Sequence, residues 1–415
     1  MKIKLGVFFG GKSVEHEIAV ITYSQALSSI NTDKYEVVPI YISKQGLLYT
    51  GEDLFELENF KDMDVLLKRC YPVTIVNTGK TWEVVRVHPH LFSKKVLNTI
   101  DVAFPIVHGT NCEDGTVAGY LNLLGIPYVG PDIIASGIGM DKILMKKVLK
   151  ESGLPVVDYV AFFSTEYIED EEKIQNKIGE KLRYPLIVKP GNLGSSVGIK
   201  KVREESELAE AIEYAMEFSD RVIVEEAVQN LKEINCSVIG NLAETEASVC
   251  EEPWFSDEIL SYADKYMGGS GSKGSKGSKV AVNGKVQGTK APVKGMAASK
   301  KKLPADISDE KSKEIQEFAK ETFKVLGCSG VARVDFLMDT KTNKVYVNEI
   351  NTIPGALSYY LWEASGKTFE EEIDELVNIA LRRNQEREKL TFSYDQNILA
   401  MQGGTKGAKG VKGRK

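Results

Sequence analysis

The chain has 415 residues, 42% of them hydrophobic and 27% charged, a composition typical of a globular protein with room for two or three packed units. The formal net charge of −6 gives no general indication of nucleic-acid binding, and no apolar run reaches the length of a membrane span. Five scattered cysteines without a C-x-x-C pair, and a start too short and strand-like for a signal peptide, lead us to expect a cytoplasmic protein.

The first third of the chain alternates between β-rich and helical patterns. The expected elements are a strand over 2–9, a helix capped by Ser13, a strand over 36–41, a strand over 101–107 and a helix over 115–124. The buried stripe of the first helix would include Val20, Ile21, Ser24 and Leu27. Because single strands and helices alternate, we predict a parallel α/β domain over 1–130.

Residues 6–13, GVFFGGKS, satisfy the P-loop pattern G-x-x-x-x-G-K-[ST]. A P-loop must curl so that its backbone N–H groups face a phosphate. Bulky Val7, Phe8 and Phe9 instead continue the strand, so that the turn begins only at Gly10. We therefore interpret this match as a strand followed by a turn, with a P-loop NTPase as the alternative from another functional class.

The rest of the chain reads as an α+β arrangement. The expected elements are a helix over 141–151, strands over 185–189, 222–225, 233–240, 331–338 and 344–350, and a helix over 308–326. We place a central unit at 131–224 and a C-terminal unit at 225–392.

Two segments are too polar and too rich in glycine to order themselves. Residues 268–302 are rich in Gly, Ser and Lys and contain no acid, and residues 393–415 end in a repeated G-x-K pattern. We expect a flexible insertion and a disordered basic tail. Lysines without interleaved aromatic residues do not favour nucleic-acid binding, so we expect neither a nucleic-acid nor a membrane partner.

Residues 189–198, KPGNLGSSVG, follow a predicted strand. Glycines and serines in such a loop can cover phosphates with N–H and hydroxyl groups, and Lys189 adds a positive charge. Further on, alternation along two strands places Asp335 with Arg333, and Glu349 with Asn351, on one face each. The oxygen ligands of Asp335, Glu349 and Asn351 would suit Mg²⁺ bound to phosphates, whereas a solvated sheet face is the alternative.

Three other polar stretches are ambiguous by themselves. Glu225 and Glu226, with Glu233 beyond them, either contact a nucleotide or are charges at a strand end. Glu15 either binds a substrate ammonium or simply occupies a first helical turn. The stretch HGTNCEDG over 108–115 joins a strand end, a polar turn and a helix start, while His88 and His90 have no metal-like spacing.

Taken in order, the motifs resemble the D-alanine–D-alanine ligase family from Lys2 to about Leu390. The resemblance is carried by GGKSVEHE, HGTNCEDGTVAGYLNLLGIPYVG, MDK, KPGNLGSSVG, VIVEE with KEIN, YADKY, GMAASKKKLPADIS, GVARVDF and VNEINTIPG. It implies a three-domain ATP-grasp fold with ATP between the central and C-terminal sheets. It also implies joining of two D-alanines through an acyl phosphate for peptidoglycan precursors, in a homodimer.

The resemblance assigns roles position by position. The implied ATP contacts are Lys142, Lys189, Ser196, Glu225, Glu226, Val228 and Glu233. The implied ligands of two Mg²⁺ ions, with Mn²⁺ as a substitute, are Asp335, Glu349 and Asn351. The implied substrate contacts are Glu15, His108, Lys265, Arg333, Gly355, Tyr360 and Leu361. Glu15, Ser195 and Tyr266 would form a network that closes a lid, and Arg333 with the Gly355 N–H would hold the oxyanion.

Three features depart from the family pattern. Tyr360 stands where the family usually has a serine that helps to bind the carboxylate of the second substrate. The lid segment carries the 268–302 insertion, and Glu226 stands where a lysine is common. The first departure leaves a ligase of the same fold with D-serine, D-lactate or another acceptor as the alternative, whereas Tyr266 is typical of D-Ala–D-Ala formation.

Overall fold

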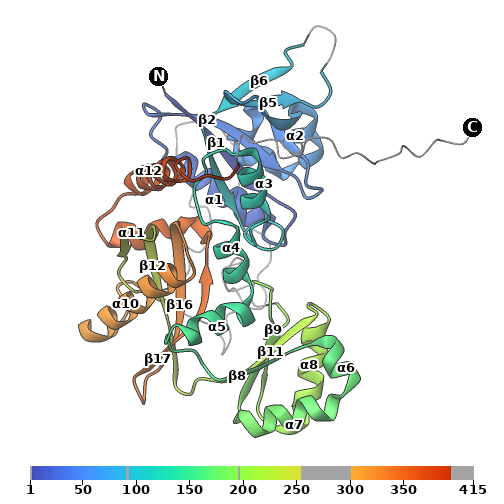
Figure 1. Cartoon of the computed structure of the whole chain (residues 1–415), viewed down its shortest axis with the longest axis vertical. Helices are drawn as coiled ribbons and strands as arrows, with labels where there is room; N and C mark the ends of the chain where they lie inside the picture. Colours follow the sequence, from blue (N-terminus) through green and yellow to red (C-terminus); the bar gives the residue numbers. More distant parts are fainter. Residues whose placement is uncertain (1, 90–92, 195–196, 254–300, 394–415) are drawn as a thin grey trace, which may run out of the picture.

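The computed structural model describes residues 2–89, 93–194, 197–253 and 301–393, and Figure 1 shows them arranged around three sheets. The seven-stranded sheet at the N-terminal end has the strand order β6-β5-β4-β3-β2-β1-β7. Its strands are β1 (Ile3–Gly10), β2 (Tyr35–Ile42), β3 (Leu48–Thr50), β4 (Tyr71–Asn77), β5 (Trp82–Arg86), β6 (Val96–Ile100) and β7 (Val102–Val107). The helices of this part are α1 (His16–Leu27), α2 (Met63–Arg69) and α3 (Thr116–Leu124).

One end of this sheet is parallel, as predicted, because β1 pairs in parallel with both β2 and the edge strand β7. Strands β3 to β6 extend it by antiparallel pairing over residues 48–100, where no elements were predicted. Strand β1 runs straight through Val7, Phe8 and Phe9 to Gly10, all of them fully buried. The backbone therefore does not curl until Gly10 and Gly11, which excludes a P-loop here.

The chain then enters α4 (Ile133–Met140) and α5 (Lys142–Glu151) before it builds two antiparallel sheets. One has the order β10-β9-β11-β8, with β8 (Tyr159–Phe163), β9 (Leu186–Pro190), β10 (Lys200–Val202) and β11 (Arg221–Glu226). The other has the order β13-β12-β16-β17, with β12 (Leu231–Gly240), β13 (Thr245–Ala247), β16 (Gly330–Asp339) and β17 (Lys344–Asn351). The remaining helices are α6 (Ser164–Glu169), α7 (Glu171–Lys181), α8 (Leu208–Met216), α10 (Asp309–Val325), α11 (Tyr359–Ala364) and α12 (Phe369–Arg387).

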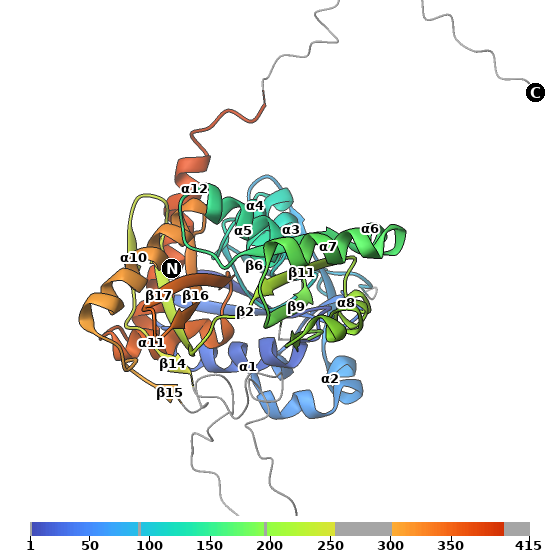
Figure 2. The same ribbon diagram turned by 90° about the horizontal axis from the view of Figure 1, so that it is seen from below.

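Each sheet has its own apolar core. Residues of α7 and α8 pack on the β8–β11 sheet, and residues of α5 and α10 pack on the β12–β17 sheet. The apolar side of helix α12 joins the core of the first sheet, although α12 is the last helix among the described residues. Figures 1 and 2 show the three sheets meeting around α4 and α5. The domain boundaries at 130 and 224 remain a prediction.

Two details of the predictions need correction. Helix α1 begins at His16, because Ser13 forms a separate turn in which its Oγ accepts the Glu15 N–H at 3.0 Å. Of the predicted stripe Val20, Ile21, Ser24 and Leu27, only Val20 is fully buried. The residues buried on this helix are His16, Ala19, Val20, Thr22, Tyr23 and Ala26.

The predicted flexible insertion over 268–302 extends too far at its end. Lys301 and Lys302 form strand β15, which pairs with β14 (Glu252–Pro253). The pairing of β14 with β15 orders both lysines. The rest of that segment and the tail from 394 lie outside the described residues. Within the described ranges, no helix has the length and apolar character needed to cross a membrane.

Candidate active site

A cleft between the sheets collects residues from distant parts of the sequence. Predicted site residues that line it are Glu15, His108, Lys142, Arg333, Glu349, Asn351 and Gly355. They come from the start of α1, the end of β7, the start of α5 and the paired strands β16 and β17. The predicted residues Ser195, Ser196, Lys265 and Tyr266 lie outside the described residues, so the predicted lid network remains untested.

The pairing of β16 with β17 explains how the predicted metal ligands meet. Asp335 stands opposite Glu349, and Arg333 stands opposite Asn351. Arg333 holds Asp335 through two hydrogen bonds, from Nε to Oδ1 at 2.7 Å and from a terminal nitrogen to Oδ2 at 2.8 Å. Asn351 Nδ2 also donates to Asp335 Oδ2 at 3.1 Å.

This donor set fits a magnesium ion. Two carboxylates and one amide oxygen are hard ligands, and they lie on one face of neighbouring strands beside Lys142, as a phosphate-bound Mg²⁺ requires. Asp335 is neutralised by Arg333 in the described structure. A metal ion that binds Asp335 must therefore share this carboxylate with the guanidinium or displace it.

The predicted phosphate lysines belong to a buried charged cluster. Lys142 Nζ lies 3.5 Å from Glu349 Oε2 and donates to the Leu193 carbonyl at 2.8 Å, which ties α5 to the glycine-rich loop. Lys189 Nζ lies 2.9 Å from Glu225 Oε2, and Lys146 Nζ lies 3.1 Å from Glu225 Oε1. Burial would raise the pKa of Glu225, but the two ammonium groups outweigh it and lower that pKa.

Lys146 was not predicted as a site residue, although its spacing from Lys142 indicates that it lies on the same side of the helix. It follows Lys142 by four residues on α5, so that both side chains point to the same side of the helix. The side chain of Lys146 is completely buried, and burial lowers the pKa of its ammonium to about 8. The cluster of Lys142, Lys146 and Lys189 thus concentrates positive charge where phosphates are predicted to bind.

The other predicted nucleotide contacts lie where β11 leads into β12. Glu226 accepts the Arg183 N–H at 2.9 Å, and Val228 is half-buried in the connection. Glu233 stands on β12 opposite Leu337. Their roles toward a nucleotide remain predictions.

Glu15 and His108 meet at the other end of the cleft. Gly109 has a positive φ of 75°, and a Cβ at this position would lie only 2.6 Å from Glu15 Oε2. Glycine is therefore required for the strand end to approach Glu15. A Cβ on Gly194 would lie 3.8 Å from the same oxygen, so the glycine-rich loop also reaches Glu15.

His108 is buried as a neutral imidazole. Its Nδ1–H donates to the Ile353 carbonyl at 2.9 Å, and its Nε2 accepts the Thr22 hydroxyl at 3.1 Å. Burial lowers the pKa of His108, against the opposing effect of Glu15. The Thr22 oxygen in turn accepts the Ala356 N–H at 3.2 Å, so the imidazole and α1 together hold the turn that carries Gly355.

Glu113 holds the same turn from the opposite side. Its Oε1 accepts the Ile353 N–H, and its Oε2 accepts the Gly109 N–H, both at 3.2 Å. Burial and the nearby Glu15 carboxylate raise the pKa of Glu113 to about 7. The sequence did not single out Glu113 within the HGTNCEDG stretch, because its partner Ile353 lies 240 residues away.

The segment after Gly355 has an unusual backbone. Ala356, Leu357 and Ser358 have φ angles of 53°, 52° and 58°, which form one left-handed turn of non-glycine residues. Such backbone is costly and is found mainly where the surrounding structure imposes it for function. The turn leads directly into α11, where Leu361 is completely buried and Tyr360 is 7% exposed.

These features agree with comparisons to known proteins. Residues 4–131 match the family model for the N-terminus of D-ala D-ala ligases, and residues 148–289 and 279–378 match the model for the C-terminus. The chain belongs to the D-alanine–D-alanine ligase family. A D-alanine–D-alanine ligase from Thermosipho melanesiensis is 40% identical over 97% of this chain and 99% of its own length. One from a Thermoanaerobacter species is 38% identical over 93% of this chain and 98% of its own length.

Solved structures of this ligase family have the same fold. The D-alanine–D-alanine ligase from Coxiella burnetii superimposes with a TM-score of 0.73 at 30% identity, covering 94% of this chain and 96% of its own. The VanG D-Ala:D-Ser ligase from Enterococcus faecalis also gives a TM-score of 0.73, at 31% identity, covering 92% of this chain and all of its own. The predicted ATP-grasp fold is therefore confirmed.

Proposed function

We propose that this chain joins two D-alanine molecules in an ATP-dependent reaction that supplies peptidoglycan precursors. The family match over nearly the whole chain supports this activity. The observation that carries the proposal is the cleft, where Glu15, Lys142, Arg333 and Gly355 converge although they come from four distant segments. The donor is the D-alanine whose carboxylate is activated and loses an oxygen, and the acceptor is the one whose amine attacks the activated carbon.

The first step needs a charged site more than covalent help. A carboxylate is a poor electrophile, so transfer of the γ-phosphoryl group converts the donor carboxylate into an acyl phosphate. Lys142, Lys146 and Lys189 surround the predicted phosphate site with positive charge. Mg²⁺ held by Asp335, Glu349 and Asn351 would neutralise the phosphates and orient them.

Glu15 supplies the counter-charge for the donor ammonium. It is 7% exposed, lines the cleft, and lies against Gly109 and Gly194. Burial lowers the pKa of the neighbouring His108, so the imidazole does not bring a positive charge that would compete with the donor ammonium. Burial of the donor beside these groups also keeps water away from the acyl phosphate.

When the acceptor amine attacks the acyl phosphate, negative charge builds on the oxygen of the tetrahedral intermediate. Arg333 and the Gly355 N–H would stabilise this charge. Burial by itself would lower the pKa of Arg333, but Asp335 outweighs it, so the guanidinium stays charged. The turn from Thr352 to Ala356 is clamped by Glu113, His108 and Thr22, which fixes the Gly355 N–H before substrate arrives. Loss of one such hydrogen-bond donor in an oxyanion hole typically lowers the reaction rate by about a hundred- to a thousandfold.

The first experiment measures ADP and phosphate release with ATP, Mg²⁺ and D-alanine, with the product identified by mass. Turnover that depends on D-alanine and yields the dipeptide is the expected result. Arg333→Ala should reduce this turnover by about two orders of magnitude or more, while ATP still raises the melting temperature. Dipeptide formation at an unchanged rate in Arg333→Ala would contradict the proposed mechanism.

The main alternative is a ligase that uses a different acceptor substrate, because the Tyr360 hydroxyl is hydrogen-bonded inside the protein. It donates to Glu251 Oε1 at 2.9 Å instead of facing the cleft as the family's serine would. The similar Enterococcus faecalis structure is named for a D-Ala:D-Ser product. Turnover with D-alanine alone that is weak, but rises strongly when D-serine or D-lactate is added, would assign the chain to this alternative.

We further propose a cytoplasmic homodimer that uses Mg²⁺, with Mn²⁺ as a substitute. Support comes from the family membership, since ATP and the peptidoglycan precursors of this ligase class are cytoplasmic molecules. Light scattering of the purified chain should give twice the monomer mass. Chelation of the metal should abolish ADP release, and a chelated enzyme that still turns over would remove Mg²⁺ from the proposal.

A further inference from the structure

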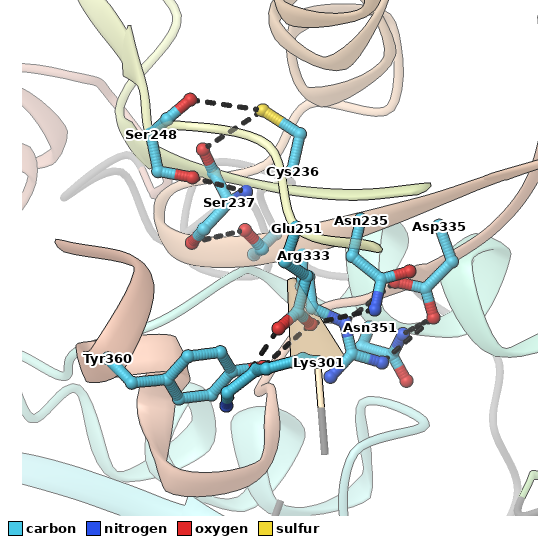
Figure 3. Close-up of polar contacts among 11 residues, drawn as sticks. Asn235, Cys236, Ser237, Ser248, Glu251, Lys301, Arg333, Asp335, Asn351 and Tyr360 are labelled. Atoms are coloured by element: carbon cyan, nitrogen blue, oxygen red, sulfur yellow. Dashed lines mark hydrogen bonds and ion pairs between the residues drawn. The ribbon is translucent and has the colours of Figure 1, made fainter. Parts of the chain in front are cut away.

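Two cysteines meet in the β12–β17 sheet, in a contact that the proposed function does not use. Cys236 lies on β12 and Cys250 lies on the segment that follows β13, and their side chains are 0% and 2% exposed. Both belong to the same apolar core. Figure 3 shows the Cys236 thiol directed at the Ser248 carbonyl, 3.6 Å away, on the segment that continues to Cys250.

The strand pairing places the two cysteines opposite each other. Asn235 and Glu251 exchange two backbone hydrogen bonds of 2.9 Å, so they form a hydrogen-bonded antiparallel pair. The next two positions, Cys236 and Cys250, then form the closely spaced kind of pair, in which the Cα atoms are about 4.5 Å apart. A disulfide requires Cα atoms that are about 4.4–6.8 Å apart, so the pairing meets this requirement.

A β-bulge gives this pairing local freedom. The Ser248 N–H donates to the Ser237 carbonyl at 2.8 Å, which is one residue out of step with the preceding pair. Two residues, Val249 and Cys250, therefore oppose a single residue of β12. The bulged segment continues the edge strand β13, and local opening of such a peripheral segment would admit a small oxidant to the thiols.

The two thiols are not chemically equivalent. They are hydrogen-bonded to each other, and this bond raises the pKa of Cys236 and lowers the pKa of Cys250. The Ser312 hydroxyl on α10 also donates to Cys250 Sγ at 3.7 Å, which favours the thiolate further. Because the thiolate is the nucleophilic form of cysteine, Cys250 is the sulfur that reacts first, and Cys236 is the thiol beside it.

The other three cysteines are ordinary buried thiols. Burial raises the pKa of Cys70 to about 11 and that of Cys112 to about 12, and it also raises the pKa of Cys328. A role as small apolar side chains accounts for all three. They therefore serve as internal controls for the reactivity of the pair.

We propose that Cys236 and Cys250 form a reversible disulfide when the folded protein meets a hydroperoxide. With hydrogen peroxide, the Cys250 thiolate attacks one oxygen and breaks the O–O bond, which gives a sulfenic acid, and the leaving hydroxide takes up a proton to become water. The Cys236 sulfur then attacks the Cys250 sulfur, the S–S bond forms, and the hydroxyl group leaves as a second water with the thiol proton. Two thiols are oxidised by two electrons, and one peroxide is reduced to two waters.

A dithiol reductant would reverse the reaction by thiol–disulfide exchange. Transient disulfides of this kind are the ones that cytoplasmic proteins form, usually as redox sensors. The bond would tie β12 to the segment that carries Glu251, and β12 is paired with the strand that carries Arg333 and Asp335. The inference does not depend on the proposed ligase activity, because it concerns only the two thiols.

Mass spectrometry of the oxidised protein tests the proposal. The reduced, folded chain is treated with hydrogen peroxide, its free thiols are alkylated under denaturing conditions, and it is cleaved after glutamate. Glu244 and Glu246 lie between the two cysteines and allow this cleavage to separate them, whereas no lysine or arginine lies between them. We expect one linked pair of peptides that contains Cys236 and Cys250, with the other three cysteines alkylated. Dithiothreitol before alkylation should return all five cysteines to the alkylated form.

Serine variants separate the roles of the two thiols. Cys236→Ser should stop at the sulfenic acid of Cys250, which dimedone traps as a stable adduct. Cys250→Ser should give at least about tenfold less adduct on Cys236, because its raised pKa keeps it as the unreactive thiol. Cys328→Ser, in the same core, is the matched control and should form the disulfide at the rate of the wild type.

A wild-type chain in which peroxide leaves the two cysteines unlinked, or links either of them mainly to another cysteine, would overturn the inference. A Cys236–Cys250 link that forms only after unfolding in urea would overturn it as well, because the folded sheet would then not bring the thiols together. A chain that shows no ligase activity but forms the link in the folded state would refute the proposed function and leave this inference standing.

Discussion

Glu113 shows how a single partly buried carboxyl connects the two ends of the site. It accepts backbone N–H groups from Gly109 and Ile353, and it lies close enough to Glu15 for repulsion between the carboxylates. Burial and Glu15 raise its pKa from 4.5 to about 7. An ammonium bound beside Glu15, as the proposed function requires, would relieve part of this repulsion.

Stability should depend on pH through this residue. An acid whose pKa is raised in the folded state contributes its full stability below pH 4.5, and this contribution is lost as the pH rises through about 7. The loss is about 3 kcal/mol at most, by the cost of each pKa unit. Glu113→Gln cannot ionise, so its unfolding free energy should fall less than that of the wild type between about pH 5 and about pH 8.

Urea unfolding of both proteins at the two pH values measures this difference. Glu58→Gln serves as a control, because the side chain of Glu58 is 77% exposed, and its curve should follow the wild type. If Glu113→Gln and the wild type lose the same stability over this range, Glu113 titrates normally in the folded protein.

At the scale of elements, α12 carries an unusual buried acid. Glu372 is completely buried between the helix and the first sheet's core, and neither of its carboxyl oxygens has a hydrogen-bond partner among the described residues. Burial raises its pKa well above the ordinary value. The helix is otherwise well formed, with Thr368 and Glu371 in a capping box.

Replacement of this acid should stabilise the protein. Glu372→Met has a similar volume and removes an uncompensated polar group, so it should add about 1–3 kcal/mol to the unfolding free energy at neutral pH. The gain should grow as the pH rises above the ordinary pKa of 4.5, because the unfolded wild-type chain then ionises Glu372 whereas the folded protein must keep it protonated. Glu386→Met, on the exposed side of the same helix, should change stability by less than about 0.5 kcal/mol. Destabilisation by Glu372→Met would mean that the carboxyl has an essential partner.

The left-handed turn over residues 356–358 is the second element with a clear prediction. Left-handed backbone costs about 1–2 kcal/mol per non-glycine residue, and branching at Cβ makes it worse. Ala356→Val should therefore reduce the unfolding free energy by about 2 kcal/mol or more and slow dipeptide formation, since the adjacent Gly355 N–H would shift. Ala356→Gly permits the same backbone and should remain active. Equal activity and stability of the valine and glycine variants would show that the turn is not held in this conformation.

At the scale of the whole molecule, the termini are not equivalent. The N-terminal strand β1 lies inside the first sheet between β2 and β7, whereas the family match ends at residue 378 and the basic repeat begins only at Gly403. Removal of residues 403–415 should therefore leave kcat and KM within about twofold of the full chain, because these residues have the composition of a segment that buries little apolar surface. A large loss of activity in the shortened chain would assign the tail a role in catalysis.

Much of the fold was predictable because its signals are local. The strand at the start, the helices over 115–124 and 308–326, and the strands β12, β16 and β17 all appeared within about two residues of their predicted ends, whereas the short strand β13 was not predicted. Period-two alternation also predicted that Asp335, Glu349 and Asn351 meet, and β16 and β17 confirm this pairing. The hairpins over residues 48–100 were missed because short, mixed strands have weak periodicity.

The sequence by itself determined the order of motifs, and with it the family and the ATP-grasp fold. Only the tertiary structure decided which partners those residues have. Lys146 joins Glu225, Glu113 clamps a turn on the far side of the sequence, and Glu251 takes the Tyr360 hydroxyl away from the cleft. The physical reason is that propensity and periodicity act over a few residues, whereas a buried charge is satisfied by whatever distant group the packing of the sheets brings beside it.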